Sequence, residues 1–194
     1  MCEIKPIMLA AGLSSRIGER NKLLLPIHGV PMIQHMVATY RVVVTGHEVD
    51  AVKACLDRSV VQVVHNPNYS DGQQSSVACG LRAVEQAVQI LIGLSDQPTL
   101  TSSDLQMLSK AHKAGDAVRI SIPQLDGQRG NPILVLGTPR DRLLADPRSP
   151  RRKFIRANPD HVQFHALTSC GFYADVDTPE AYDAATVDNT EKTI

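Results

Sequence analysis

MLAAGLSSRIGERNKLLLP, residues 8–26, combines the local patterns from which the architecture of this chain can be predicted. The apolar residues 7–9 are typical of a buried strand, which stops at small residues and Gly12. The serines at 14 and 15 then favour the start of a helix. A strand, a tight turn and a helix N-terminus in this order direct backbone N–H groups and partial positive charge at one place, which favours an anion. Arg16 and Lys22 add full charges, so the stretch predicts a phosphate site.

The length and the composition favour one domain that spans residues 1–194. The chain carries 20 basic and 20 acidic residues, so its formal net charge is zero. This balance argues against a nucleic-acid-binding protein and against a polybasic membrane anchor. No apolar run approaches the roughly 20 residues that span a bilayer, and the cysteines are scattered without a Cys-x-x-Cys pair. We therefore expect a cytoplasmic protein with reduced thiols.

Strand and helix patterns alternate along the chain. Residues 41–45 and 90–94 are typical of strands, whereas residues 48–56 and 75–87 show apolar side chains at helical spacing. This alternation predicts a three-layer, Rossmann-like α/β fold with a mostly parallel sheet. Ligands in such folds bind at the carboxyl ends of the strands, and Asp96 comes directly after the most apolar strand.

Two connections are shorter than the ~2–6 residues that are usual in α/β units. A helix expected to end at Tyr40 runs directly into a strand that begins at Arg41. A second helix meets the next strand between Ala87 and Gln89. We therefore predict that connecting residues are missing at both places.

Acidic residues stand where a divalent metal would meet a nucleotide phosphate. Asp96 follows a buried strand, and Asp177 precedes a late helix. Carboxylates bind Mg²⁺ through one or two oxygens and leave its other positions to water and phosphate. Asp96 is therefore the first expected metal ligand and Asp177 the second. The alternative is that Asp96 is a turn residue before Pro98, but the predicted phosphate site upstream favours the metal.

Two histidines in the last quarter of the chain suggest a second metal site. His161 and His165 have the spacing that holds a metal on a helix. Apolar residues alternate with them at Val162 and Phe164, however, so the segment is more typical of a strand that carries both histidines on its polar face. We favour the strand over the metal site.

The opening stretch also carries a family resemblance. It resembles the signature of nucleotidyltransferases related to the molybdenum-cofactor guanylyl- and cytidylyltransferases, in which Leu-Ala-Ala/Gly-Gly is followed by Arg, Gly and Lys. It is neither a P-loop nor a dinucleotide Gly-x-Gly-x-x-Gly motif. The resemblance covers nearly the whole chain and implies a nucleotide-diphospho-sugar transferase type of fold. Further matching stretches are NPNYSDGQQSSVACGL at 66–81, GLSDQP at 93–98, GQRGNP at 127–132 and DVDTPEAY at 175–182.

The resemblance implies roles for the matched residues. In this family the first motif holds the triphosphate and meets the base, the second loop also meets the base, and an Asp binds the metal. The implied triphosphate-binding residues are Gly12, Arg16 and Lys22, and the implied catalytic groups are Arg16, Lys22 and Asp96. The implied base contacts are main-chain groups of Leu9, Ala10 and Ala11 together with Ser75 and Ser76. The implied cofactor is Mg²⁺, with Mn²⁺ as its substitute.

Within this family the chain most resembles the cytidylyltransferases. Ala11 stands where the guanylyltransferases commonly have Gly, which implies a preference for CTP. Arg129, Gly130, Asn131 and Pro132 resemble the Arg-Gly-His-Pro of the cytidylyl branch, with Asn131 in the place of His, and they inherit an acceptor-binding role. The implied acceptor is a molybdopterin-type phosphorylated cofactor, and the implied protein partner is an apo-molybdoenzyme.

Two other kinds of function remain open from the sequence. The first is guanylyl transfer, or transfer to a sugar or alcohol phosphate, on the same fold. The second is a non-catalytic chaperone that binds a nucleotide or cofactor and passes it to an apo-enzyme. Release of pyrophosphate from a nucleoside triphosphate separates the transferases from the chaperone, because a carrier releases none.

Overall fold

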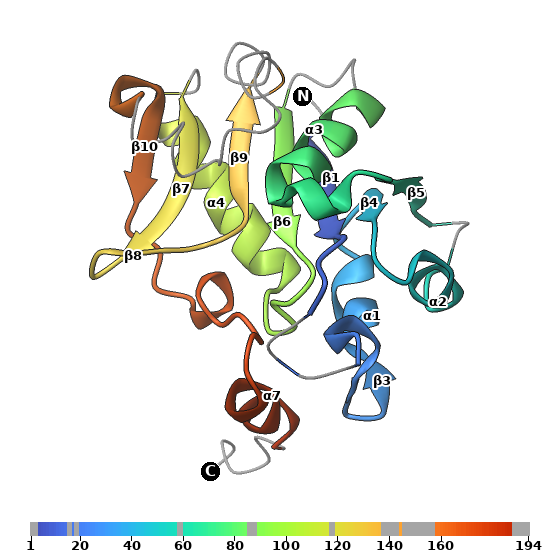
Figure 1. The fold of residues 1–194 in the computed structure, drawn as a ribbon. Helices are drawn as coiled ribbons and strands as arrows, with labels where there is room; N and C mark the ends of the chain where they lie inside the picture. The colour runs from blue at the N-terminus through green and yellow to red at the C-terminus, as the bar shows by residue number, and fades with distance from the viewer. Residues whose placement is uncertain are drawn as a thin grey trace.

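The computed structural model describes residues 4–14, 17, 20–57, 60–84, 89–116, 119–136, 144 and 158–187. Its centre is an eight-stranded mixed sheet (Figure 1). In spatial order the strands are β10 (Val162–His165), β7 (Ile120–Leu125), β9 (Ile133–Leu136), β6 (Gln89–Leu94), β1 (Ile4–Ala10), β4 (Val42–Thr45) and β5 (Gln62–His65), and β8 (Gln128–Arg129) pairs with β7.

Strand β1 lies in the middle of the sheet, parallel to both β4 and β6. The chain first builds outward from β1 to β4 and β5, and then crosses to the other side of β1 with β6. Among the described strands of this sheet, β8 and β9 run in the direction opposite to the others. A reversal of strand order of this kind opens a crevice at the carboxyl ends of the strands, which is where ligands bind. The predicted mostly parallel, Rossmann-like fold is confirmed.

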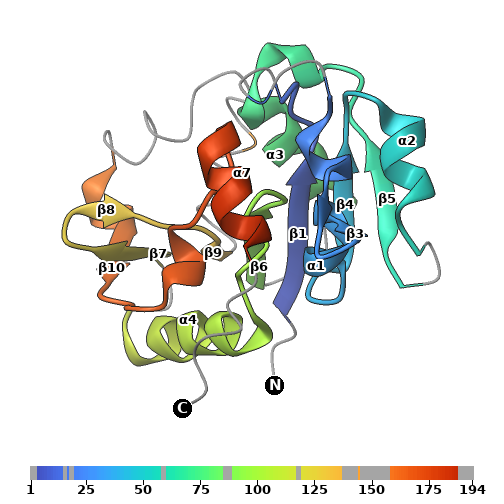
Figure 2. The same cartoon turned by 90° about the horizontal axis from the view of Figure 1, so that it is seen from below.

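Helices cover both faces of the sheet, so the fold has three layers. The helices α1 (Met32–Val37), α2 (Val49–Ala54) and α4 (Ser102–Ala114) pack on one face, and α3 (Gln73–Ala83) packs on the other (Figure 2). In β1, Met8 and Ala10 face the first group, whereas Ile7 and Leu9 face α3. Because both faces are covered, the central strands are continuous apolar runs.

The last helix lies apart from these layers. Helix α7 (Pro179–Thr186) packs beside a small second sheet of β2 (Pro26–Ile27) and β3 (Val30–Pro31). The Tyr182 hydroxyl donates to the carbonyl of Pro26 at 2.6 Å. Helix α7 is thereby tied to the segment that follows Lys22.

Two expected helices differ from the structure. The described residues between β1 and Asn21 form turns and bends, and Ser14 has a φ of 55°, so no helix begins at Ser14. Helix α1 ends at Val37 rather than at Tyr40, and the backbone N–H of Arg41 donates to Pro6 of β1. Residues 38–41 therefore supply a connection of ordinary length, and the reason for expecting missing residues there does not hold. The second connection includes residues 85–88, which lie outside the described residues.

Two smaller expectations concern the described part of the chain. Cys55, Cys79 and Cys170 are free thiols. Within the same residues, no helix is both long and apolar enough to cross a membrane. No group of three or more His, Cys, Asp or Glu side chains is arranged as a metal site there. His165 lies on strand β10, as predicted, but His161 ends a short 3₁₀ helix, Pro159–His161, and so does not share that strand.

A buried polar cluster joins α4 to the outer strands. Ser121 Oγ lies 2.8 Å from His112 Nδ1 and 2.9 Å from His165 Nε2, and Gln163 donates to the same hydroxyl. His112 and Ser121 are fully buried. The polar face of β10 therefore points into the protein, whereas Phe164 is 43% exposed.

This cluster predicts a loss of stability in acid. Burial lowers the pKa of both His112 and His165 from 6.5. Below about pH 6.5 the unfolded chain therefore binds more protons than the folded one, and the free energy of unfolding falls as the pH falls. His112→Gln should make this dependence shallower between pH 7 and 5, as measured by urea unfolding. An equal slope in His112→Gln and wild type would contradict the assignment, and His65→Gln, at an exposed position, is the control.

Candidate active site

The loop after β1 is held in place by buried side chains. The Ser95 hydroxyl, at the end of β6, donates to the carbonyl of Leu9 at 2.8 Å and so ties the ends of the two strands together. Asn21 is buried, and its side-chain oxygen accepts from the backbone of Leu23 at 3.1 Å. This bond caps a short 3₁₀ helix, Lys22–Leu24. The cap fixes the backbone from which the Lys22 side chain reaches the end of β6.

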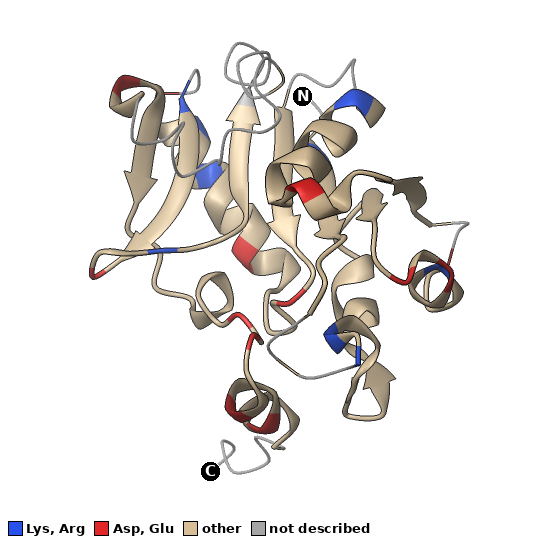
Figure 3. Ribbon diagram, in the orientation of Figure 1, with Lys and Arg blue, Asp and Glu red and all other residues tan. Residues whose placement is uncertain are grey.

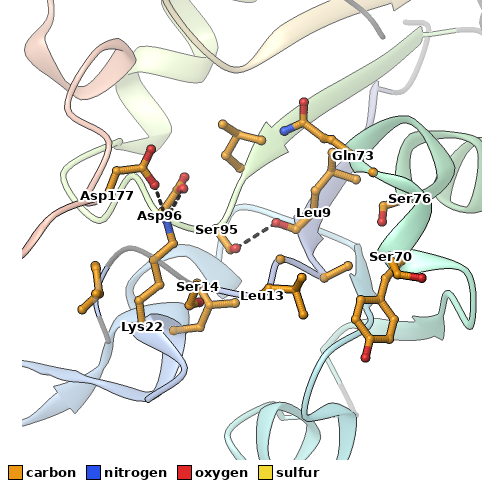
Figure 4. A pocket seen from close by; sticks show the side chains of 17 residues that line it. Leu9, Leu13, Ser14, Lys22, Ser70, Gln73, Ser76, Ser95, Asp96 and Asp177 are labelled. Carbon is orange, nitrogen blue, oxygen red and sulfur yellow. Dashed lines mark hydrogen bonds and ion pairs between the residues drawn. The ribbon is translucent and has the colours of Figure 1, made fainter. Parts of the chain in front are cut away.

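Lys22 meets two carboxylates that are distant in sequence. Its Nζ lies 2.6 Å from Asp96 Oδ2 and 2.6 Å from Asp177 Oδ1 (Figure 4). It also donates to the carbonyl of Val176 at 3.1 Å. The backbone N–H of Val176 donates to the carbonyl of Asp96 at 2.8 Å. The segment that carries Asp177 is therefore tied to the end of β6, and the three charged groups converge at one point.

The electrostatics of this point favour positive charge. Burial lowers the pKa of Lys22, but the nearby carboxylates Asp96 and Asp177 outweigh it, so the pKa lies above its ordinary value. Burial, and then repulsion from Asp96 and Asp177, raise the pKa of Asp175 to about 6. Acidic positions at the end of β6 and just before α7 thus lie near one another (Figure 3), and a cation is stabilised among them.

The same carboxylates fit a divalent metal. Asp96 Oδ1 is buried and has no hydrogen-bond partner within the described residues. Such an atom loses its hydration without compensation unless something binds it. Asp96 and Asp177 already converge on one cation, the Lys22 ammonium. Two carboxylates, with water and phosphate oxygens completing the shell, make a typical Mg²⁺ or Mn²⁺ site.

A cavity of about 340 Å³ opens beside these charges. Figure 4 shows Lys22, Asp96 and Asp177 together at one side, and Ser76 and Gln73 of α3 at the other. The volume lies within the usual range for small-ligand sites, roughly 300–1,000 Å³. The charged side suits phosphate, and the polar, uncharged side suits a neutral group such as a base.

Most of the site residues expected from the sequence come together in this cavity. Among the described residues, the expected ones that line it are Leu9, Ala11, Gly12, Lys22, Ser76, Asp96 and Asp177. Ala10 is buried toward the helices on the other face of the sheet. Ser75 does not line the cavity, and its hydroxyl bonds within the loop instead. Arg16 lies outside the described residues.

The expected acceptor-binding stretch lies next to the cavity rather than in it. The backbone N–H of Asn131 donates to the carbonyl of Phe172 at 2.9 Å, and the Gln97 side chain donates to the same carbonyl at 3.0 Å. Gly130 packs so closely that a Cβ would lie 2.7 Å from that oxygen. Pro132 is buried, and Arg129 lies over the Phe164 ring, 5.0 Å from its centroid. The stretch is thus joined to the residue that follows Asp96.

Three residues in and before the first turn of α3 were missed from the sequence. Tyr69 and Gln73 line the cavity, and Asn66 is buried behind it. Tyr69 packs against Gly46, where a Cβ would lie 2.5 Å from the Tyr69 Cβ. The polar composition of the loop indicated a role near the site. The spacing of its residues did not indicate which side chains point into the cavity.

Known proteins resemble this chain over almost its entire length. It is 26% identical to the molybdenum cofactor cytidylyltransferase of Escherichia coli K12, covering 98% of this chain and 100% of the relative. It is 28% identical to nicotine blue oxidoreductase of Paenarthrobacter nicotinovorans, over 90% of this chain and 92% of that relative.

Solved structures resemble the fold of this chain as well. The crystal structure of Rv0371c of Mycobacterium tuberculosis H37Rv matches with a TM-score of 0.77, at 24% identity over 94% of this chain and 96% of that one. Rv0371c has also been solved in complex with manganese. That structure matches this chain with a TM-score of 0.74, at 21% identity over 94% of this chain and 97% of that one. A family model, the MobA-like NTP transferase domain, matches residues 6–162. The chain therefore belongs to the MobA-like NTP transferase family of nucleotidyltransferases.

Proposed function

We propose that this protein transfers CMP from CTP to a molybdopterin-type phosphorylated cofactor and releases pyrophosphate, in a reaction that depends on a divalent metal. The observation that carries the proposal is the contact of Lys22 Nζ with Asp96 and Asp177, at 2.6 Å each, on one side of a nucleotide-sized cavity. The cytidylyltransferase relative of Escherichia coli supports the specific activity, because its whole length aligns with this chain.

Asp96 and Asp177 are the residues that would hold the metal. The unpaired, buried Oδ1 of Asp96 supports this assignment, as does the manganese complex of the mycobacterial protein. A bound Mg²⁺ or Mn²⁺ would neutralise the negative charge on the phosphate oxygens.

The proposed reaction needs no covalent bond between the protein and the substrates. A terminal phosphate oxygen of the acceptor forms a bond to the α-phosphorus of CTP, and the bond from that phosphorus to the bridging oxygen of the β-phosphate breaks. The phosphate nucleophile is ionised at neutral pH, so no general base is required. Lys22, with Arg16, would stabilise the departing pyrophosphate, while the loop around Gly12 holds the triphosphate in line for attack.

The acceptor would bind beside the cavity, along residues 129–132. This stretch contacts the Phe172 carbonyl that Gln97 also binds, so it lies close to the loop that follows Asp96. Arg129 lies over the exposed ring of Phe164 and presents a planar cation at the surface. A planar, phosphorylated acceptor would complement these groups.

The Paenarthrobacter relative makes oxidoreduction a second candidate, because that protein is named an oxidoreductase and aligns with 90% of this chain. The charged groups of the cavity argue for the transferase. Two carboxylates and a lysine on one side of a cavity suit a metal-bound polyphosphate, which is the substrate of a transferase.

Pyrophosphate release tests the proposal directly. The purified protein is incubated with CTP, GTP, ATP or UTP, with Mg²⁺ or Mn²⁺, in the presence and absence of the molybdopterin acceptor. We expect pyrophosphate only when metal and acceptor are both present, and fastest with CTP. Fastest release with GTP would replace CMP transfer by GMP transfer. No release with any nucleotide would contradict the transferase and favour the carrier or the oxidoreductase.

A further inference from the structure

Asn66 is a buried amide at the back of the nucleotide cavity, and nothing in the proposed reaction uses it. It follows β5 directly and is 3% exposed. Its Nδ2 lies 2.9 Å from Ser75 Oγ and 3.0 Å from Ser76 Oγ, and its Oδ1 lies 3.1 Å from the backbone nitrogen of Asn68. One side chain therefore contacts both serines at the start of α3.

The hydrogen bonds determine which way round the Asn66 amide lies. A backbone N–H can only donate, so the Asn66 oxygen must face Asn68, and its NH₂ group must face the serines. Both serine hydroxyls are consequently acceptors toward Asn66. Each hydroxyl still has one proton to donate elsewhere.

The two serines use that proton differently. Ser75 donates to main-chain carbonyls within the loop, at 2.8 Å from both Asn68 and Gly72, and it does not line the cavity. Ser76 lines the cavity at the side opposite Lys22 and Asp96 (Figure 4). Asn66 occupies an acceptor position of Ser76, and Ser76 donates to no acceptor within the part of the chain that the structure describes, so its proton is left for a ligand.

We propose that Asn66 is a positioning residue that holds Ser76 as a hydrogen-bond donor to an acceptor atom on the edge of the nucleobase. This inference rests on the proposed function, because it takes the charged side of the cavity for the triphosphate. Cytosine carries adjacent acceptors at O2 and N3, which complement a hydroxyl whose donor direction is fixed. Ser75 supports the loop instead.

The direction of the hydrogen bond between residue 66 and Ser76 can be reversed by a substitution that hardly changes the shape of the side chain. In Asn66→Asp the carboxylate still accepts from Asn68 but can no longer donate to Ser76. The Ser76 proton then turns toward the carboxylate, and a lone pair faces the base. Ser76→Ala removes the hydroxyl without altering Asn66, so it tests the same contact if Asn66→Asp does not fold.

The experiment compares two ligands that differ only in the base. Affinities for CTP and for ribose 5-triphosphate are measured with Mn²⁺ by calorimetry. We expect Ser76→Ala to weaken CTP binding by about 3–10-fold and Asn66→Asp by about tenfold or more, relative to ribose 5-triphosphate. Because both ligands carry the same triphosphate, the ratio of their two affinities cancels the repulsion between that triphosphate and the added carboxylate. Ser103→Ala, at an exposed position on α4, is the matched control and should keep the wild-type ratio.

A double-mutant cycle tests whether Asn66 acts through Ser76. In the Ser76→Ala background, Asn66→Asp should change the affinity ratio by less than about twofold. Additive losses, equal losses for the two ligands, or an unchanged ratio in the single variants would each overturn the inference. If the wild-type protein binds neither ligand, the proposed function itself fails. Binding of both ligands without an effect of Asn66 or Ser76 leaves that function intact.

Discussion

Replacing Lys22 with alanine is expected to lower turnover by about 10²-fold or more, the scale of losing one preorganised electrostatic donor. Lys22 supplies the positive charge at the side of the cavity where the pyrophosphate would leave, and its Nζ contacts Asp96 and Asp177. Pyrophosphate release with saturating CTP and acceptor measures the effect. Near-normal turnover in Lys22→Ala would refute the assignment of the phosphate side of the cavity.

For the same variant we expect no loss of metal affinity, in contrast to the loss of turnover. The Lys22 ammonium lies between the two carboxylates, so it competes with any other cation there. Lys22→Ala should therefore bind Mn²⁺ at least as tightly as wild type, measured by electron paramagnetic resonance, although it turns over slowly. Lys110→Ala, at an exposed position on α4, is the control and should leave both quantities unchanged.

Asp96→Asn is expected to lower turnover by about 10³-fold, the upper end for one electrostatic group, because the carboxylate would serve both the metal and Lys22. The substitution keeps the shape of the side chain but removes its charge. It leaves the Lys22 ammonium with Asp177 as its remaining carboxylate contact among the described residues. Turnover and Mn²⁺ affinity should fall together.

The joint loss of turnover and Mn²⁺ affinity distinguishes the role of Asp96 from that of Lys22, because Lys22→Ala should lower turnover without lowering Mn²⁺ affinity. Asp183→Asn, at an exposed position on α7, is the matched control for the loss of one negative charge. Unchanged Mn²⁺ affinity in Asp96→Asn would exclude Asp96 as a metal ligand, whatever its effect on turnover. Circular dichroism of both variants would show that the fold is retained.

Some elements of this fold are specified by local signals in the sequence, because their causes are local. The capping box of Thr101 and Asp104 is present, with the Thr101 backbone N–H 2.8 Å from Asp104 Oδ2. Thr178 caps α7, where Pro179 takes the first helical position. Both depend on side chains that bond to backbone groups within one turn, so no distant part of the chain is needed to specify them.

Helix α1 was predicted too long because a distant contact determines its end. The helical pattern continues past Val37, but Tyr40 is fully buried and its hydroxyl fills the space above Gly93 of β6. The backbone of Arg41 pairs with Pro6 of β1. Sheet pairing and core packing thus outweigh helix propensity at this point, and neither can be read from residues 32–40.

The apolar runs of β1 and β6, and the polar and acidic groups that follow them, can be read from the sequence, and they predict the edge of the sheet where a ligand would bind. Which of these groups meet depends on the packing of the whole chain. Lys22 is separated by 74 residues from Asp96 and by 155 from Asp177. The same packing decides that Ser76 faces the cavity and Ser75 does not. Periodicity specifies which face of an element is buried, but contacts between distant side chains depend on how the elements pack.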